Sequence, residues 1–126
     1  MKFIHTDKAP AAVGPYSQAV AANGMLYLSG QIAIDPAEGR IVAKDIGGQA
    51  EQCCRNVEAV LAEAGCSMDA VVRTTCFLAD IGDFQAFNAV YAKHFVNKPA
   101  RSCVAVAALP AGALCEIEVV AVLDEQ

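Results

Sequence analysis

The sequence predicts a single α/β domain of the α+β type, with two helices packed on one face of a five- or six-stranded mixed sheet. Its 126 residues fit one domain, so we expect residues 1–126 to share one core. The periodic segments occur in the order strands, helix, strand, helix, strands. Hydrophobic residues make up 56% of the chain, which excludes a disordered protein.

The N-terminal part of the chain holds the clearest turn signals. Asn23-Gly24 lies between two apolar runs and predicts a β-hairpin with a two-residue loop. Residues 35–39 (DPAEG) predict a second turn, which an extended segment follows. The predicted strands of this part are residues 3–6, 18–22, 25–29 and 40–43.

A first helix is predicted over residues 46–64. Asp45 is a good N-cap in front of it, and Gly65 is the expected C-terminal stop. Apolar residues recur at three- and four-residue intervals along its last turns: Val57, Val60, Leu61 and Ala64.

A second helix is predicted after a cap at Asp80 or Asp83, and Asn97-Lys98-Pro99 ends it. Aromatic residues form a stripe along one of its sides: Phe84, Phe87, Tyr91 and Phe95. The predicted strands around this helix are residues 71–78, 100–107 and 115–123.

The last predicted strand is apolar on both of its faces, although two helices can cover only one face of the sheet. In so short a chain, the missing layer is most simply another subunit. The sequence therefore predicts a homo-oligomer that packs through its sheet.

Charge and composition weigh against several classes of function. The net charge of −5 disfavours nucleic-acid and anionic-membrane binding, which need a positive surface, although a local basic patch stays open. The N-terminus lacks a signal-peptide core, and polar residues interrupt the most apolar stretch, residues 18–34, so we expect a cytoplasmic protein. The six cysteines form no C-x-x-C pair, so we expect free thiols and no metal.

Arg101 is the first candidate for a functional residue. On a strand it shares a face with Cys103 and Ala105, whose small side chains leave room for a ligand. Its planar guanidinium suits a carboxylate. The alternatives are an ion pair with Glu116 or Glu118, or simple exposure to solvent.

Glu116 and Glu118 share a face of the last predicted strand, in an apolar run. An unpaired buried carboxylate is costly, so one of them is expected to pair with Arg101 or Arg73, and the other to activate a water. The alternative is an edge strand that leaves both carboxylates in solvent.

Three further segments hold weaker candidates. Cys103 is a potential nucleophile, but neither histidine has a context that places a base beside it. Tyr16, Ser29 and Gly30 lie near strand ends, where backbone can approach a ligand closely. Ordinary turn chemistry explains these positions equally well.

Several segments together resemble the Rid (YjgF) family of reactive-intermediate deaminases, in particular its deaminase-competent branch. They occur in the same order and span nearly the whole chain: residues 14–18 (GPYSQ), 29–32 (SGQI), 56–65 (NVEAVLAEAG), 87–91 (FNAVY), 99–104 (PARSCV) and 116–118 (EIE). Two departures are a short segment between His94 and Pro99, and Cys115 in place of an aliphatic residue.

The resemblance implies a chorismate-mutase-like fold and a homotrimer with a cleft between each pair of subunits. It implies hydrolysis of enamines and imines, such as aminoacrylate and its imine tautomer, to α-keto acids and ammonia, without a cofactor. Arg101 would hold the substrate carboxylate, and Glu116 would position the attacking water with help from the Cys103 backbone. The residues expected to line the cleft are Tyr16, Ser29, Gly30 and Asn88.

This chemistry is physically coherent, because an imine carbon is already electrophilic and needs orientation and a placed water rather than a strong nucleophile. Two other functions stay open. One is a regulatory module that binds keto acids without turnover. The other, a ribonuclease or translation inhibitor, is disfavoured by the acidic charge and by the lack of a histidine pair suited to RNA cleavage.

Overall fold

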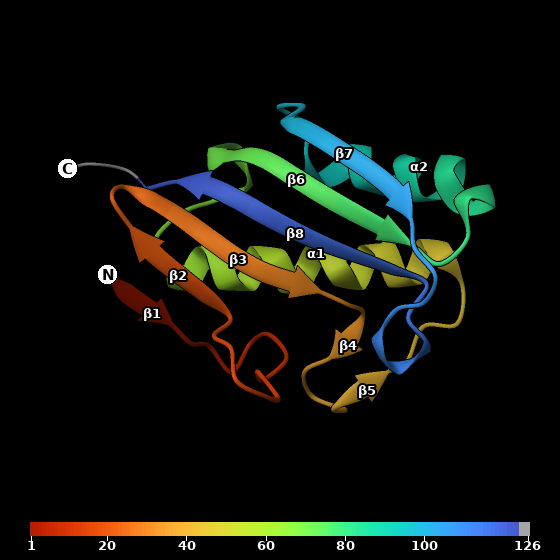
Figure 1. Ribbon diagram of the computed structural model, residues 1–126, viewed down its shortest axis with the longest axis horizontal. Helices are drawn as coiled ribbons and strands as arrows, with labels where there is room; N and C mark the ends of the chain where they lie inside the picture. Colours follow the sequence, from red (N-terminus) through yellow and green to blue (C-terminus); the bar gives the residue numbers. More distant parts are fainter. Residues whose placement is uncertain (124–126) are drawn as a thin grey trace.

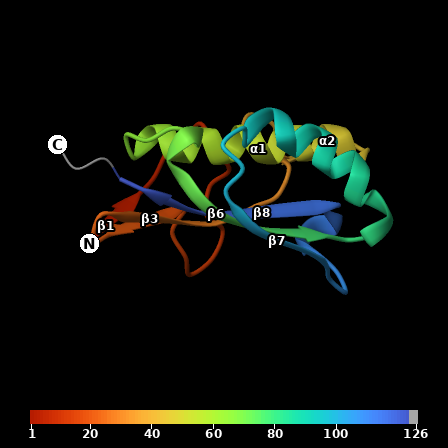
Figure 2. The same ribbon diagram turned by 90° about the horizontal axis from the view of Figure 1, so that it is seen from above.

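Six strands form one mixed sheet in the computed structural model, which describes residues 1–123, and two helices lie together on one face of that sheet (Figure 1). The view from above shows the two layers and leaves the opposite face of the sheet open (Figure 2). The strands of the sheet are β1 (Lys2–Ile4), β2 (Ala19–Ala22), β3 (Met25–Gln31), β6 (Val71–Leu78), β7 (Ala100–Ala105) and β8 (Cys115–Val122). The helices are α1 (Ile46–Glu63) and α2 (Phe84–His94). The predicted fold class is confirmed.

Shorter elements complete the described chain. A two-stranded hairpin, β4 (Ile34–Asp35) and β5 (Arg40–Ile41), lies outside the main sheet. Three single 3₁₀ turns cover Met68–Ala70, Ile81–Asp83 and Pro110–Gly112. The second of them leads directly into α2, and the third lies between β7 and β8.

The strands are ordered β1-β2-β3-β8-β6-β7 across the sheet. Neighbours are antiparallel, except that β6 and β7 are parallel, with α2 as the crossover between them. The last strand in the sequence therefore lies in the middle of the sheet, and β7 forms one edge. The interpretation of residues 115–123 as an edge strand is wrong, because β3 and β6 pair with β8 on both sides.

The predicted hairpin turn and the predicted ends of the first helix are confirmed. Asn23 and Gly24 both have positive φ, 54° and 75°, as a tight hairpin requires. Asp45 caps α1 by accepting a hydrogen bond from the Gly48 amide at 2.7 Å, and Gly65 follows the helix with a φ of 85°.

The start of α2 differs in detail from the prediction. Asp80 accepts a hydrogen bond from the Gly82 amide at 2.8 Å, whereas Asp83 makes no capping bond with its side chain. The cap therefore belongs to the 3₁₀ turn, and α2 continues from that turn. The predicted strand at 100–107 ends two residues early, at Ala105.

The core lies between the helices and the sheet and is mainly aliphatic, with buried cysteines and the aromatic side chains of Phe87, Tyr91 and Phe95 among its members. Its largest fully buried side chains include Leu26, Val57, Val60, Leu61, Leu78, Phe87, Ile117 and Val119. Fully burying one such side chain stabilises the fold by about 1.5–3 kcal/mol. The helical spacing that predicts α1 therefore also identifies the face by which it packs.

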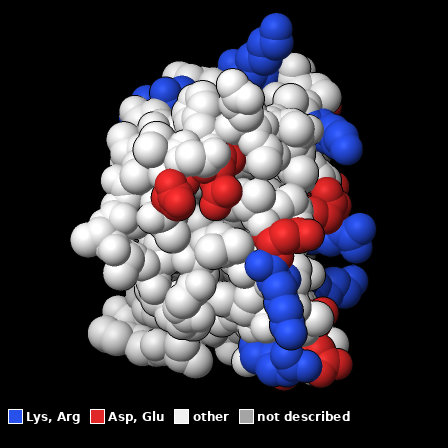
Figure 3. Space-filling model, turned by 90° about the vertical axis from the view of Figure 1, so that its right-hand side faces the viewer, with Lys and Arg blue, Asp and Glu red and all other residues white. Residues whose placement is uncertain are grey.

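The open face of the sheet carries apolar side chains beside polar ones, among them Glu116, Glu118 and Ser102. Along β8, side chains alternate between the helix layer and this open face. Large side chains on the open face stay half-exposed: Tyr27 at 49%, Val104 at 46% and Val122 at 44%. Seen from one end of the molecule, most charged side chains gather along one flank, and two acidic groups stand in the otherwise uncharged area beside it (Figure 3). None of the helices in residues 1–123 is long and apolar enough to cross a membrane.

Candidate functional site

Arg101 lies on the edge strand β7, beside Thr74 of β6 in the parallel register. Its Nη1 donates a hydrogen bond to Asn88 Oδ1 on α2, with a donor–acceptor distance of 2.7 Å. The guanidinium carbon lies 4.7 Å from the centre of the Tyr91 ring and 5.6 Å from that of Phe84. Cation–π attraction and one hydrogen bond therefore hold the guanidinium against α2.

The three α2 residues reach the same arginine because of their spacing. Phe84, Asn88 and Tyr91 are four and then three residues apart, so they share one face of the helix. The predicted aromatic stripe is confirmed for Phe87, Tyr91 and Phe95, which are buried, while Phe84 is half-buried at the end near Arg101. Asn88, predicted only to line a cleft, is the hydrogen-bond partner of Arg101.

The positive charge of Arg101 is not neutralised by a carboxylate. Within residues 1–123 Arg101 takes part in no ion pair, so the predicted alternative of a pair with Glu116 or Glu118 is wrong. A guanidinium has five N–H donors, of which Asn88 uses one. A groove of about 360 Å³ opens beside it, lined by Asn88, Tyr91, Ala92, Phe95, Val96, Lys98, Pro99 and Arg101. The arrangement is ready to receive an anion.

Cys103 shares the face of Arg101 on β7, as predicted, and its half-buried side chain packs against the core. Burial raises the pKa of the thiol, and the Arg101 charge offsets this only in part. The histidines are engaged elsewhere: His5 lies 3.1 Å from Asp7, and His94 lies 2.8 Å from Glu51. A raised pKa and the absence of a nearby base among the described residues do not support a nucleophilic thiol.

Glu116 lies on the open face of the sheet, and its carboxylate rests on Gly30 of the neighbouring strand β3. Burial raises the pKa of the Glu116 carboxyl, and repulsion from Glu118 raises it further. Neither carboxylate forms an ion pair within residues 1–123, and Arg73 instead donates a hydrogen bond to the Ser102 hydroxyl at 3.1 Å. A half-buried carboxylate with a raised pKa is suited to accept a proton.

Gly30 makes this placement possible. The β3–β8 register shifts between Leu28 and Gln31, so the backbone at Gly30 comes close to the Glu116 side chain. A Cβ atom at residue 30 would overlap the carboxylate, so only glycine fits without displacing Glu116. Ser29 is fixed beside it, because its hydroxyl donates to Ser17 O at 2.6 Å. Both predicted residues therefore belong to one site with Glu116.

Tyr16 joins this site across a groove of about 520 Å³. Its ring is half-exposed, and its hydroxyl accepts a hydrogen bond from the Val13 amide at 3.4 Å. The groove is lined by Pro10, Ala11, Val13, Tyr16, Gln18, Ser29, Gly30, Gln31, Ile32, Ile34, Pro110, Ala111, Glu116 and Glu118. Most of these side chains are apolar, so the groove offers an apolar wall beside one acidic pair.

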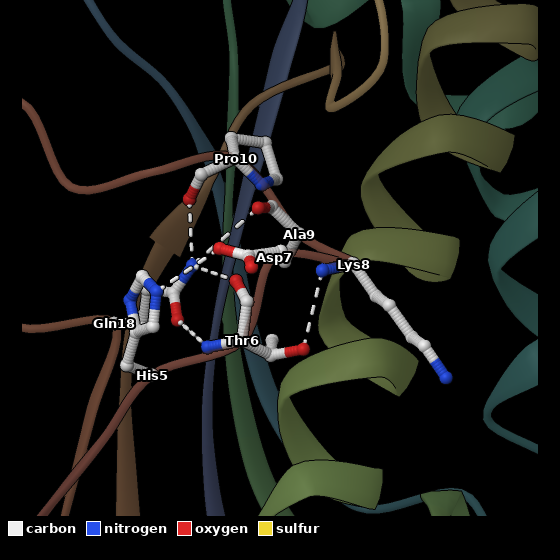
Figure 4. Close-up of polar contacts among 7 residues, drawn as sticks. All are labelled: His5, Thr6, Asp7, Lys8, Ala9, Pro10 and Gln18. Carbon is white, nitrogen blue, oxygen red and sulfur yellow. Dashed lines mark hydrogen bonds and ion pairs between the residues drawn. The ribbon is translucent and has the colours of Figure 1, made fainter.

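Gln18 is a structural residue of the groove that the sequence interpretation assigned no role. Its buried side-chain amide bonds to both sides of the loop that carries the groove wall (Figure 4). Oε1 accepts from the Thr6 amide at 2.7 Å, and Nε2 donates to Thr6 O at 3.0 Å and to Pro10 O at 2.8 Å. The backbone oxygen of Gln18 also accepts from the Ser29 amide at 2.9 Å. The sequence signal that could have identified Gln18 is a glutamine at the start of an apolar strand, because a buried side-chain amide needs hydrogen-bond partners.

The predicted site residues form two separate groups in one chain. Thr74 pairs with Arg101 on one side and with the buried Val119 on the other, so Arg101 faces the helix layer. Glu116 lies three residues before Val119 on the same strand and therefore faces the opposite, open side. We call the first group, Arg101 with Asn88 and Cys103, the cationic half-site. The second group, Glu116 with Tyr16, Ser29 and Gly30, is the acidic half-site.

Comparisons with known proteins agree over nearly the whole chain. The model of the Endoribonuclease L-PSP family matches residues 6–123. A RutC family protein of Synechocystis is 53% identical over 126 residues, covering 98% of this chain and 97% of the relative. The human protein named 2-iminobutanoate/2-iminopropanoate deaminase is 47% identical over 122 residues, covering 96% of this chain and 89% of its own length. A Lactococcus lactis protein named as a candidate regulator, AldR, is 52% identical over 122 residues, covering 96% of this chain and 97% of its own.

Solved structures give the same result for the fold. A protein of the conserved Rid family from Yersinia pestis has a TM-score of 0.94 at 48% identity, covering 97% of this chain and 98% of its own. The structure of TdcF from E. coli with bound serine has a TM-score of 0.93 at 41% identity, covering 98% and 100%. The chain therefore belongs to the Endoribonuclease L-PSP family, the YjgF/Rid family.

Proposed function

We propose that this protein is a hydrolytic deaminase of reactive enamine and imine intermediates, which it converts to α-keto acids and ammonia. The observation that carries the proposal is the pair of unneutralised charges: a guanidinium held ready by α2 and a half-buried carboxylate held over Gly30. An imino acid needs both, since its carboxylate must be oriented and its imine carbon must meet a water. Relatives named as imine deaminases support the same chemistry.

In this proposal Arg101 binds the substrate carboxylate with the donors that Asn88 leaves unused. Glu116 accepts one proton of the attacking water while the water oxygen bonds to the imine carbon, and that proton passes to the nitrogen, which gives a carbinolamine. The hydroxyl of the carbinolamine then loses its proton, which Glu116 passes to the amine nitrogen, and the carbon–nitrogen bond breaks to release ammonia and leave the keto acid. An enamine first takes a proton on its β-carbon to become the imine. No cofactor takes part in these steps, and the Cys103 backbone assists in placing the water.

We further propose that the two half-sites come from different copies of the chain. Arg101 and Glu116 face opposite sides of the same sheet, so one copy cannot bring them to one substrate without unfolding the sheet. A second copy packed on the open face would bury the half-exposed Tyr27, Val104 and Val122. A homotrimer with three clefts, placed in the cytoplasm, is the assembly that we propose.

The test generates imines in situ from amino acids with an amino-acid oxidase and follows their decay with and without the protein. We expect the protein to accelerate decay, and both Arg101→Ala and Glu116→Gln to remove the acceleration while the fold is retained. Tyr27→Phe is the matched control, because the Tyr27 hydroxyl has no part in the proposed chemistry. If the wild-type protein leaves the decay of every imine unchanged, the deaminase proposal is wrong.

A second candidate is a regulatory module that binds keto acids without turnover, which the name of the Lactococcus lactis relative favours. It predicts saturable binding of a keto acid at Arg101 and no acceleration in the same assay. A ribonuclease, which the family's name suggests, finds less support. His5 and His94 contact different acidic residues, and neither lines the groove that holds Glu116. Cleavage of RNA that survives in Arg101→Ala protein free of contaminating nucleases would revive that function.

A further inference from the structure

Tyr91 is buried beneath Arg101, and two contacts fix its ring. The ring of Phe95 stacks against it, with centroids 4.4 Å apart and planes inclined by 23°. At the other end, the Tyr91 hydroxyl lies 2.7 Å from Thr74 Oγ1 on β6. The guanidinium carbon of Arg101 lies 4.7 Å from the centre of this ring. Any rotation of the ring would therefore change the surface on which the guanidinium rests.

Packing alone does not explain the hydroxyl pair. Thr74 is fully buried and Tyr91 is nearly so, and burying two hydroxyls is costly unless they bond to each other. Valine and phenylalanine would fill the same space without that cost, because replacing both partners of a buried hydrogen bond by apolar groups is close to neutral. Compared with such an apolar pair, the hydrogen bond between Thr74 and Tyr91 fixes the orientation of the Tyr91 ring.

The strand register ties this pair to the arginine. Thr74 and Arg101 are direct partners in the parallel β6–β7 register, so their side chains rise from adjacent points of one sheet face. The hydroxyl, the ring and the guanidinium then form one connected stack between that face and α2.

We infer that Thr74 and Tyr91 form a positioning pair that sets the orientation of the Arg101 guanidinium for a carboxylate ligand. The inference rests on the proposed function only for the nature of the ligand, an imino or keto acid. Thr74 is fully buried, and the Tyr91 hydroxyl bonds to Thr74 rather than facing the ligand. Each acts through Arg101, so its loss should weaken carboxylate binding more than it slows the chemical step.

The experiment measures the affinity of the assembled protein for pyruvate by calorimetry, together with KM and kcat for an imine generated in situ. The variants are Thr74→Val, Tyr91→Phe, the double variant and Thr74→Ser. We expect each of the first two to weaken pyruvate binding and to raise KM by about three- to tenfold, with kcat nearly unchanged. The double variant should be no weaker than either single variant, because both remove the same hydrogen bond. Thr74→Ser keeps the hydroxyl and should bind as the wild type does.

Val60→Ala is the control for a general loss of stability, since Val60 is buried on α1 away from the arginine. It should lower the unfolding temperature and leave pyruvate affinity unchanged. If Thr74→Val and Tyr91→Phe behave like this control, the pair is only structural and the inference is overturned. The inference also fails if the wild-type protein does not bind pyruvate. Binding that follows the expected pattern without imine hydrolysis would instead support the positioning pair and contradict the deaminase proposal.

Discussion

The two half-sites hold their charges by different means. In the cationic half-site, three side chains of one helix surround Arg101 and leave most of its donors unused. In the acidic half-site, the backbone positions the charged side chain. A register shift and Gly30 make room for Glu116, and Gln18 fixes the loop across the groove. In the proposed function the first group binds an anion on the covered face of the sheet, and the second accepts a proton on the open face. In the proposed assembly, each half is completed by another copy of the chain.

Arg101→Lys should have the largest effect and separates the charge of the cationic half-site from its shape. A lysine keeps the positive charge but cannot bind a carboxylate with two parallel hydrogen bonds or rest flat on Tyr91. We expect kcat/KM for imine hydrolysis to fall by about 10²–10³-fold, which corresponds to about 3–4 kcal/mol. Steady-state kinetics with an imine generated in situ measures this. Activity within a few-fold of the wild type would show that charge alone suffices.

Gly30→Ala tests the acidic half-site. The added methyl group overlaps the Glu116 carboxylate, so Glu116 must move. We expect kcat to fall by about 10²-fold, since a displacement of about 1 Å at a reacting group has this effect. Gly47→Ala is the matched control, because a Cβ atom there meets only Val90, at 4.0 Å, and the helix accepts alanine. Equal activity of the two variants would contradict the role given to Gly30.

The pH dependence of activity gives a smaller effect. Glu116 must be ionised to accept a proton, and Glu118 is the second cause of its raised pKa, after burial. Glu118→Gln should therefore move the acidic limb of the kcat/KM profile to lower pH, because it removes a repulsion that disfavours the charged form. A profile measured over the acidic range compares the two proteins. A limb that stays in place, or moves to higher pH, would show that another group limits the rate.

The smallest effect is expected at the contact between α1 and α2, outside both half-sites. Glu51 binds His94 and Arg55, which together lower the pKa of its carboxyl. A carboxyl with a lowered pKa in the folded state stabilises the fold above its usual pKa and loses that contribution as pH falls through the lowered value. Glu51→Gln should reduce the free energy of unfolding at pH 7 by less than about 1 kcal/mol, because the contact is partly exposed. Urea denaturation at pH 7 and at pH 3 should show a smaller difference at pH 3 than at pH 7, and activity should not change.

The sequence predicts the local elements well, because their signals are short-range. Asn23-Gly24 defines the hairpin, Asp45 and Gly65 delimit α1, and the β-branched run over 71–78 matches β6. The short motifs that carry the resemblance also contain residues of both half-sites, whose roles stay predictions. What could not be predicted is which face of the sheet each half-site occupies.

The reason lies in the pairing of strands that are distant in the sequence. Alternation within β7 relates Arg101 to Cys103, and alternation within β8 relates Glu116 to Glu118. The relation between the two strands depends on the register of both with β6, which comes from pairing between segments that are distant in the sequence. The sequence therefore allowed an Arg101–Glu116 ion pair that the sheet forbids. The aromatic residues of α2 were likewise predicted only as a stripe along one side of the helix, while their contact with Arg101 depends on the β6–α2–β7 crossover.

The most direct test of the central claim mixes two inactive proteins. Arg101→Ala and Glu116→Gln chains carry different tags, are co-expressed and are purified through both tags, and their imine hydrolysis is then measured. If each active site takes Arg101 from one copy and Glu116 from another, every mixed trimer that both tags select carries one intact site of its three, which is about a third of the wild-type sites. Activity near that level is the predicted result. A mixed assembly as inactive as each parent would contradict a site built from two copies.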